Sequence, residues 1–259
     1  MQERFQPTPS SSSTSSSSSN SSSSSSSSSS GSSRVFCVSD LHVDKAGGAN
    51  MSWLQRISSS AFRNDVLIVA GDVADTAAAV AAALKLLSPR FARVVWLPGN
   101  HEAWLRPGSS DCAHYSDSFS KLLALRQMAD ECGVDVGPVE VTPGLIVLPL
   151  LSWYTATFDT SDPRPGSELG KAMGCCELQL QLEQVSSAVH VYGHSHINAD
   201  MVLPTAAALK SMSSTGSSSS RRYVQYALDA VGAESAGLYC LWDGRGLAAP
   251  GTVLPITGL

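Results

Sequence analysis

The stretch RVFCVSDLH fills residues 34–42, and DVLIVAGD fills residues 65–72. Each begins as a short apolar run rich in β-branched residues and ends abruptly in polar ones, a pattern that predicts a buried strand leading into a loop. RVVWLPGN, over residues 93–100, repeats the pattern a third time. These three strands are the starting point for the fold. Residues 43–64, 102–118 and 154–175 are interpreted as loops that would line a pocket.

Two segments have the composition of helices. AAAVAAALKLL, over residues 77–87, is rich in strong helix formers and stops before Pro89, and Asp75 and Thr76 are predicted to cap its start. DSFSKLLALRQMADECG, over residues 117–133, is amphipathic and closes on a glycine.

The second half of the chain consists mainly of predicted strands. They lie at residues 145–151 and 189–192, and at RRYVQYAL and GLYCLWDG, which start at residues 221 and 237. A serine-rich stretch over residues 211–220 is predicted to be a surface loop. Strands that alternate with helices at first and then follow one another indicate a layered α/β domain.

The chain has 259 residues, but its beginning lacks the apolar side chains that a core needs. Residues 10–33 are serine at all but three positions. Such a segment buries too little apolar surface to offset the entropy lost on ordering, so residues 1–33 are predicted to be a disordered serine-rich tail. Residues 34–259 suffice for one domain around a single core.

Charge and cysteine content narrow the class of protein. Seventeen basic and twenty-two acidic side chains give a net charge of −5, which argues against broad nucleic-acid binding. No apolar run is long enough to predict a membrane span, and the start has no signal-peptide pattern. Six cysteines without paired spacing fit a reducing compartment. We therefore expect a cytoplasmic protein. The serine-rich tail is poor in arginine, which makes it a weak transit peptide, but a plastid location stays open.

The polar groups that can carry chemistry follow predicted strands. They are Asp40-Leu41-His42 after the first strand, Gly71-Asp72 after the second, Gly99-Asn100-His101-Glu102 after the third, and Gly193-His194-Ser195-His196 after the strand at 189–192. In α/β sheets, functional sites form at the carboxyl ends of strands. The four groups are therefore expected to converge at one edge of the sheet.

The residue types and their spacing suit metal ions. In Asp-x-His and His-x-His, alternate residues of an extended chain point the same way, so both side chains can face one metal. The two carboxylate oxygens of Asp72 allow it to bridge two cations, and imidazole and carboxylate ligands suit Fe, Zn and Mn. The glycines before Asp72, Asn100 and His194 permit sharp turns and close backbone approach.

Each motif by itself also has an ordinary structural interpretation. Asp-x-His pairs occur widely without function, Gly-Asp is a common turn, and His-x-His can be a surface pair. The signal is the joint occurrence of the four motifs. They occur in order, each at the end of an apolar strand, and coincidence is a poor explanation for that arrangement. Asp75 is interpreted as a helix cap rather than a ligand, and Glu102 as a residue that orients the loop of His101.

Together the motifs resemble those of the calcineurin-like metallophosphoesterases, from residue 34 to about residue 202. The segments DSFSKLLAL, LPLLSWYTATFD and RRYVQYAL further resemble an intracellular plant and algal branch of that family. The resemblance implies a calcineurin-like fold, a β-sandwich flanked by α-helices, and two metal ions. The first metal would be held by Asp40, His42, Asp72 and His196. The second would be held by Asp72, Asn100 and His194. His101 would be the catalytic acid or electrostatic group beside the substrate phosphate.

One part of the family pattern is absent. The family has a further histidine between the Asn-His and Gly-His-x-His motifs, a ligand of the second metal, whereas residues 152–189 contain none. His190 lies four residues before His194, ~13 Å along an extended strand at ~3.3 Å per residue, and His114 lies in a predicted loop. A deletion and an incomplete gene model would each explain the gap. The second metal is expected to bind weakly.

Three functions fit these observations. The first is a metal-dependent phosphoesterase that hydrolyses a phosphate ester with a hydroxide bridging two metals. The second is a degenerate relative that binds metal or phosphate without turnover, which the absent histidine favours. The third is a nuclease of the same superfamily, which the acidic balance disfavours. The expected partner is a small phosphoester or phosphorylated substrate, while its identity and the oligomeric state stay open.

Deleting residues 1–33 is expected to leave the melting temperature unchanged within about two degrees, because the serine-rich tail has no apolar surface to contribute. Thermal unfolding of the full-length and truncated chains, followed by circular dichroism, measures this. A loss of several kcal/mol, a large share of the ~5–15 kcal/mol that stabilises a typical domain, would show that the tail packs on the domain.

Overall fold

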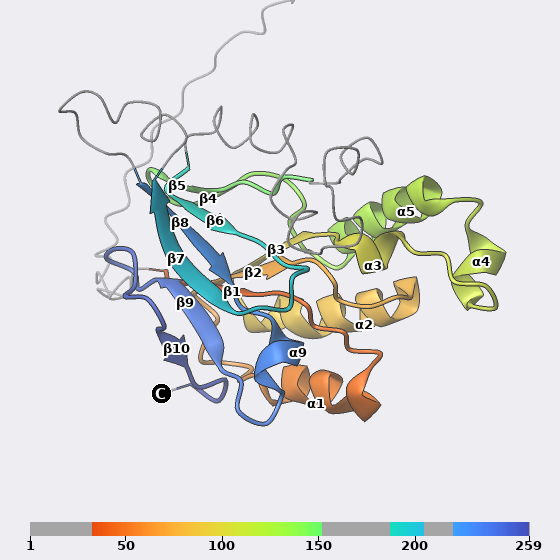
Figure 1. Ribbon diagram of the computed structural model, residues 1–259, viewed down its shortest axis with the longest axis horizontal. Coiled ribbons are helices and arrows are strands. Elements are labelled where there is room, and N and C mark those ends of the chain that lie inside the picture. The colour runs from red at the N-terminus through yellow and green to blue at the C-terminus, as the bar shows by residue number, and fades with distance from the viewer. Residues whose placement is uncertain (1–32, 152–186, 205–219, 259) are drawn as a thin grey trace, which may run out of the picture. The chain divides into compact units, whose positions relative to one another are not determined.

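The computed structural model describes residues 33–151, 187–204 and 220–258. These residues belong to one unit that starts at residue 31, and Figure 1 labels its helices and strands. The predicted tail lies outside the described residues apart from Ser33, as does the serine-rich stretch up to residue 219. No helix in the described parts is long and apolar enough to cross a membrane.

The largest sheet has five strands in the order β10-β9-β1-β2-β3. The three strands predicted first from the sequence, β1 (Val35–Val38), β2 (Val66–Ala70) and β3 (Arg93–Leu97), run parallel in it. Antiparallel partners complete it, with β9 (Leu238–Trp242) beside β1 and β10 (Val253–Leu254) beside β9. Both β1 and β2 are buried along their whole length, as continuous apolar runs in a covered parallel sheet should be.

Helices connect the parallel strands. The turn η1 (Ala46–Gly48) and α1 (Ala49–Arg56) join β1 to β2, and α2 (Ala77–Leu87) with η2 (Ser88–Arg90) joins β2 to β3. Three more helices follow β3, namely α3 (Asn100–Ala103), α4 (Ser110–His114) and α5 (Ser118–Glu131). α2 contacts both α1 and α5, which forms a helical layer. The buried residues of α2 recur at spacings of three and four, so one apolar stripe faces the core.

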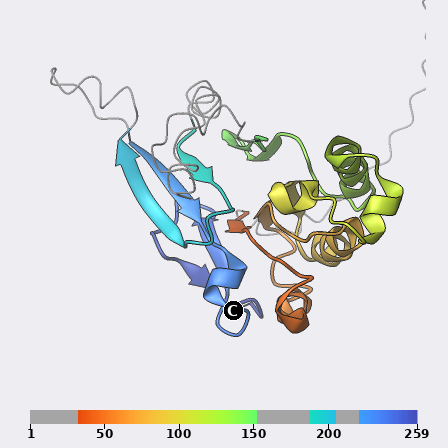
Figure 2. The ribbon, with the colours of Figure 1, turned by 45° about the vertical axis from the view of Figure 1, so that its right-hand side comes forward.

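A second sheet has three strands in the order β6-β8-β7. β8 (Ser220–Gln225) runs parallel to β6 (Val189–Val191) and antiparallel to β7 (Ala199–Pro204). Backbone hydrogen bonds join it to the end of β1: Ser39 N donates to Tyr226 O at 2.8 Å, and Leu228 N donates to Ser39 O at 3.0 Å. Figure 2 shows this sheet on one side of the unit and helices α1, α2 and α5 on the other. The predicted fold, sheets flanked by helices, is confirmed.

Two predicted strands are shorter in the structure than in the sequence analysis. The strand expected at residues 145–151 is β5 (Leu145–Val147), which pairs with the unpredicted β4 (Val139–Thr142). It stops before Pro149, which has no N–H to donate to a neighbouring strand. The segment RRYVQYAL is a strand only as far as Gln225. Its next residues, Tyr226 and Leu228, hydrogen-bond with Ser39 instead, and the short helix α9 (Leu228–Val231) begins at Leu228.

Helices also replace expected loops. Residues 43–64, for which the sequence predicts a loop, contain α1, which Trp53 anchors by donating from Nε1 to Ala236 O at 2.9 Å. The motif after β3 is not a simple turn but the first turn of α3, because the Glu102 carboxylate reaches back to the N–H of Gly99 at 2.6 Å. The polar motif residues therefore sit at strand ends, as predicted, but on more ordered backbone than loops.

Candidate metal centre

Four of the predicted ligands form one cluster at the carboxyl ends of the strands. Asp40, His42, Asp72 and His196 each offer one ligand atom, and these atoms all lie within 4.8 Å of one another. The first three are buried and His196 is exposed. The rings of His42 and His196 stack with their centroids 5.1 Å apart. These are the four residues that the family resemblance assigned to the first metal.

The other two predicted ligands adjoin this cluster. His194 Nδ1 lies 2.7 Å from Asn100 Oδ1, so the two side chains assigned to the second metal meet. The backbone N–H of His194 donates to Asp40 Oδ1 at 2.9 Å, which ties the second pair to the first cluster. The structure thus brings all six predicted ligands together.

The donor atoms of the cluster fit cations. His42 Nε2 and Asp72 Oδ2 are buried and have no hydrogen-bond partner. Each such atom costs about 1–3 kcal/mol when left unsatisfied, and a bound cation would satisfy both. Burial, helped by the charges of Lys45 and His101, lowers the pKa of His42 to about 4. The imidazole is therefore neutral at pH 7, which is the form that binds metals.

The environment of Asp40 also suits a cation. Burial is the largest influence on this carboxyl and raises its pKa, and the nearby Asp72 adds to the rise. Hydrogen bonds from Ser39 and from the N–H of His194 oppose that rise. Gln225 Nε2 donates to Asp40 Oδ2 at 3.2 Å, which fixes the orientation of the Asp40 carboxylate. Two buried carboxylates this close repel each other, and a cation between them would relieve the repulsion.

The backbone of the ligand residues is strained. Within the described residues, five that are not glycine have positive φ, and all five are predicted ligands: Asp40 (51°), His42 (41°), Asp72 (54°), His194 (83°) and His196 (53°). Each residue in this left-handed region costs about 1–3 kcal/mol and persists only where its surroundings enforce it. The expectation that Asp-x-His and His-x-His converge as alternate residues of an extended chain is therefore wrong. The chain turns sharply at each ligand, because it must leave the strand and face back across the sheet edge.

Two glycines permit the loops to approach each other. A Cβ on Gly99 would fall on the Asp72 carboxylate and lie 2.7 Å from the backbone N of Asp72. A Cβ on Gly193 would meet the carbonyl oxygen of Ala70 and lie 3.1 Å from Ser39 Cβ. The close backbone approach predicted for the glycines before Asn100 and His194 is confirmed at both positions.

Glu102 is the buried anchor of two loops. It accepts N–H bonds from Asp72 (3.0 Å), Val73 (2.6 Å), Ala74 (3.1 Å) and Gly99 (2.6 Å). Burial, and after it the charge of Asp72, raises the pKa of Glu102 to about 7, although the amide donors act in the opposite direction. Because it joins the loops after β2 and β3, Glu102 positions both Asp72 and Asn100. The sequence predicts this orienting role for the loop of His101, and the contacts of Glu102 extend it to the loop after β2.

Asp75 has a different role from the one predicted. The side chain that caps α2 is Thr76, which accepts from the N–H of Ala79. The Asp75 carboxylate lies 2.5 Å from His101 Nδ1 and accepts from Arg106 Nε at 2.6 Å. Burial alone would raise the pKa of Asp75, but these partners lower it. The predicted cap is confirmed for Thr76 and wrong for Asp75. Asp and Thr both suit an N-cap, and only the fold shows which of the two faces His101.

The buried ion pair of Lys121 and Asp111 supports the surroundings of His101. Lys121 Nζ is fully buried and lies 3.0 Å from the Asp111 carboxylate. It also donates to the carbonyl oxygens of Asp75 at 2.7 Å and Trp104 at 2.8 Å. The ring of Trp104 packs on His101 with centroids 3.8 Å apart. Lys121 therefore fixes the backbone on both sides of the His101 ring.

Lys45 is a cation beside the cluster that the sequence analysis did not single out. Its Nζ lies 3.4 Å from His42 Nδ1 and 3.3 Å from His101 Nδ1, and its side chain is 44% exposed. A lysine three residues after a ligand has no distinctive spacing, so the sequence carries no signal for it. Its position makes it able to reach an anion that approaches the cluster from solvent.

Neither remaining histidine fills the gap in the second ligand set. His114 is exposed on α4, and its Nδ1 lies 2.7 Å from the carbonyl oxygen of Ser110 in the same helix. His190 is buried on β6 and stacks on Tyr223 with centroids 5.0 Å apart. The segment that lacks a histidine lies mostly outside the described residues, from 152 to 186.

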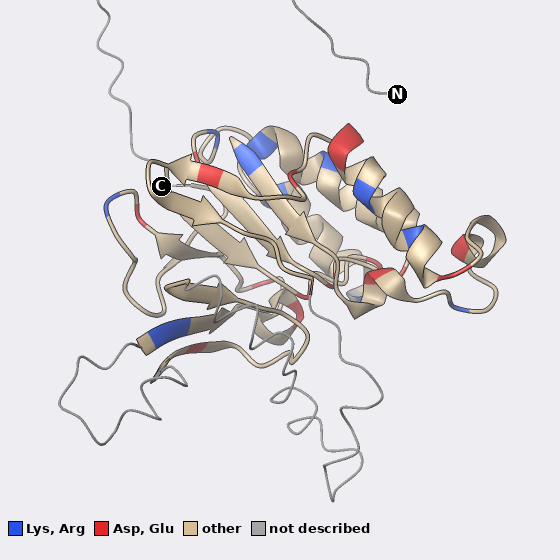
Figure 3. Cartoon of the chain, turned by 90° about the horizontal axis from the view of Figure 1, so that it is seen from above, with Lys and Arg blue, Asp and Glu red and all other residues tan. Residues whose placement is uncertain are grey.

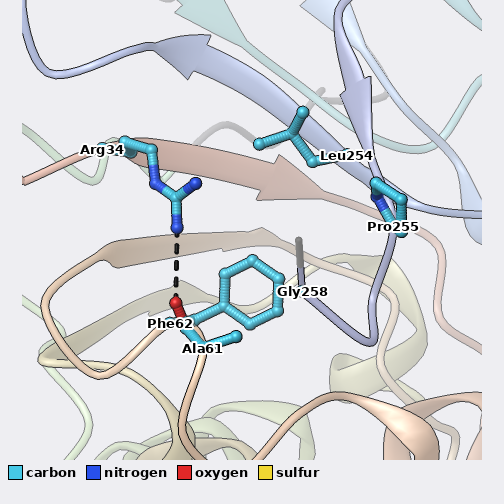
Figure 4. A pocket seen from close by; sticks show the side chains of 6 residues that line it. All are labelled: Arg34, Ala61, Phe62, Leu254, Pro255 and Gly258. Carbon is cyan, nitrogen blue, oxygen red and sulfur yellow. Dashed lines mark hydrogen bonds between the residues drawn. The ribbon is translucent and has the colours of Figure 1, made fainter.

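A cavity of about 190 Å³ lies elsewhere in the fold. Figure 4 shows its lining, which includes Arg34, Phe62 and Pro255. Arg34 precedes β1, whereas Asp40 follows it, so the cavity is at the opposite end of the strand from the metal cluster. The Arg34 guanidinium is already paired with Asp65 at 2.6 Å. The cavity is therefore separate from the candidate metal centre at the strand ends.

The family model for calcineurin-like phosphoesterases matches residues 33–198, well over half of the chain. This chain belongs to the calcineurin-like phosphoesterase family. A curated relative, the [acyl-carrier-protein] phosphodiesterase PptH of Mycobacterium tuberculosis, is 43% identical over 70 residues. That alignment covers 27% of this chain and spans only 21% of the relative.

One solved structure supports the same fold. The crystal structure of the phosphopantetheinyl hydrolase PptH from Mycobacterium tuberculosis matches with a TM-score of 0.52 at 19% identity, over 86% of this chain and 99% of that one. A protein of unknown function from Aquifex aeolicus gives a TM-score of 0.39 at 14% identity, over 76% of this chain and 91% of that one. The first likeness supports the fold, and the second is too low to bear on it.

Replacing Glu102 by Gln is expected to lower the free energy of unfolding by about 2–4 kcal/mol, because an amide offers one acceptor oxygen, and its NH₂ group would face backbone donors. Urea unfolding of the metal-free chain measures this. Glu131→Gln, at the exposed end of α5, makes the same charge change and should stay within about 0.5 kcal/mol of the wild type. Equal stability of the two variants would contradict the anchoring role of Glu102.

Proposed function

We propose that this chain hydrolyses a phosphate ester with two divalent or trivalent cations, of Mn, Fe or Zn. Asp40, His42, Asp72 and His196 would hold the first cation, and Asp72, Asn100 and His194 the second. The observation that carries the proposal is the pair of buried donor atoms without partners, His42 Nε2 and Asp72 Oδ2, inside the four-residue cluster. A purely structural cluster of this kind would leave both atoms unsatisfied in the core.

Cations bound there would lower the pKa of a water molecule and offset the negative charge that develops on the phosphate. The chain's own contribution is to orient the ligands and to handle the leaving oxygen. Because Asp75 holds Nδ1 of His101, Nε2 is the ring nitrogen left to donate a proton or a hydrogen bond to that oxygen. Lys45, partly exposed beside His101, is placed to pair with a phosphate oxygen.

A phosphodiester is the substrate class best supported. The curated relative is named as a phosphodiesterase, although the aligned segment is a small part of it. A nuclease is less well supported, because Figure 3 shows Lys and Arg scattered over several elements, with acidic positions among them, instead of lining one face. The proposed similarity to a plant and algal branch of the family rests on the three short segments quoted from the sequence. Separately, we propose that the protein is located in the cytoplasm.

The activity and the role of His101 are tested together. The purified chain, supplied with Mn²⁺, should hydrolyse a chromogenic phosphodiester, and Asp72→Asn should abolish both turnover and metal binding. His101→Ala should lower kcat by about 10²- to 10⁴-fold while the metal content stays unchanged, because His101 is not one of the proposed metal ligands. Metal analysis beside the rate assay separates the two effects. Wild-type chain that binds metal but shows no turnover on diesters or monoesters would favour the degenerate relative.

The absent histidine should make the two metals unequal. The first set has four protein ligands, whereas the second has three, one of them shared and one an amide oxygen. We expect one metal per chain at modest metal concentration, with low activity that rises as more metal is added, because water must fill the missing position. Calorimetric titration with Mn²⁺ alongside turnover measures this. Two tight and equal sites with full activity would show that another group has taken the position.

A further inference from the structure

We propose that Asp229 is the positioning residue of the first metal site, where its carboxylate holds the His196 imidazole in the tautomer that binds the cation. Asp229 lies on α9, beyond the residues that match the family model, and the sequence analysis did not predict it. The inference rests on the proposed metal site.

The geometry points to orientation of the ring. His196 Nδ1 lies 2.5 Å from Asp229 Oδ2, while Nε2 of the same ring lies 3.6 Å from Asp40 Oδ1 in the cluster. A proton held on Nδ1 by the carboxylate leaves the Nε2 lone pair free for a cation. Metal-binding histidines commonly donate their other ring nitrogen to a carboxylate, which fixes the ring and makes it a stronger donor.

The charge of Asp229 reaches a second ligand as well. The same Oδ2 atom lies 3.8 Å from His42 Nε2, the buried nitrogen that has no hydrogen-bond partner. Asp229 is not among the four residues whose ligand atoms share one small volume, so we place it beside the ligand set and not within it. One carboxylate therefore faces both imidazoles of the first site.

The backbone keeps Asp229 in that position. Leu228 N donates to the carbonyl oxygen of Ser39, the residue before Asp40. Ala227 N donates to Asn198 Oδ1 at 2.8 Å, two residues after His196. The start of α9 is thus fastened to the loops that carry two of the ligands. These bonds use main-chain groups of α9, so a side-chain substitution at Asp229 leaves them in place.

His196 needs this support more than the other ligands of the first site do. Its side chain is 41% exposed, whereas the other three ligands are buried. An exposed ring without a partner would rotate and exchange tautomers, which would weaken the site. Stacking on His42 does not distinguish the two ring nitrogens of His196, whereas Asp229, with a side chain 27% exposed, contacts Nδ1 alone.

The test compares metal binding by the full-length chain with that of Asp229→Ala and Asp229→Asn, with Mn²⁺ as the titrant in calorimetry. Asp229→Ala should weaken the tighter site by about 10- to 100-fold. Asp229→Asn should lose less, because its amide oxygen still accepts from Nδ1. In the metal-free chain, nitrogen NMR of His196 should place the proton on Nδ1, and Asp229→Ala should move it towards Nε2. Thermal unfolding without metal checks that the variants fold.

Asp243→Asn is the matched control for charge. Asp243 is an exposed turn residue after β9, at the end of the sheet opposite the cluster, and this variant should bind metal like the wild type. Unchanged affinity in a folded Asp229→Ala chain, or an equal loss in the Asp243 control, would overturn the role of Asp229 while leaving the proposed function standing. A wild-type chain that binds no metal would overturn both.

Discussion

Four backbone amides from two loops point at one buried carboxylate, that of Glu102, and the arrangement of the candidate metal centre depends on this. The loop after β2 and the loop after β3 come from strands that are neighbours in the sheet, but the sheet alone does not determine how their ends turn. Glu102 determines it, because a buried carboxylate that lost these donors would be far more costly than the strained turns it maintains. The positions of the Asp72 and Asn100 side chains therefore depend on Glu102.

The buried charged groups at this edge of the fold have hydrogen-bond partners on the side that faces away from the site. Each of the buried charges has its partners: Asp40 is held by Ser39, Gln225 and the N–H of His194, and Lys121 by Asp111 and two carbonyl oxygens. The unsatisfied atoms at the site are the ones that face its centre. This division between satisfied outer contacts and open inner ones is what separates a binding site from an ordinary buried polar network.

Most of the fold could be predicted from the sequence, because its signals are local. Apolar runs such as DVLIVAGD and the helix of residues 77–87 determine their own structure, and the motifs at their ends mark the edge where chemistry is placed. The residues that were missed act over long distances in the chain. Asp75 suits a helix cap as well as a partner for His101, Lys45 has no motif, and Asp229 meets His196 only because β8 returns the chain to the end of β1. The left-handed backbone at the ligands was missed for a related reason, since non-glycine residues adopt it only under tertiary constraint.

The spread of the cluster along the chain has a consequence for synthesis in the cell. Asp40 and Asp72 leave the ribosome first, His196 follows more than 120 residues after Asp72, and Asp229 later still. Contacts between such distant residues form only after the intervening chain has collapsed, so they are among the last to be made. A nascent chain that carries the first half of the site alone offers two carboxylates and one imidazole without a shared geometry. The complete ligand set of the candidate centre therefore exists only after the second half of the chain has folded onto the first.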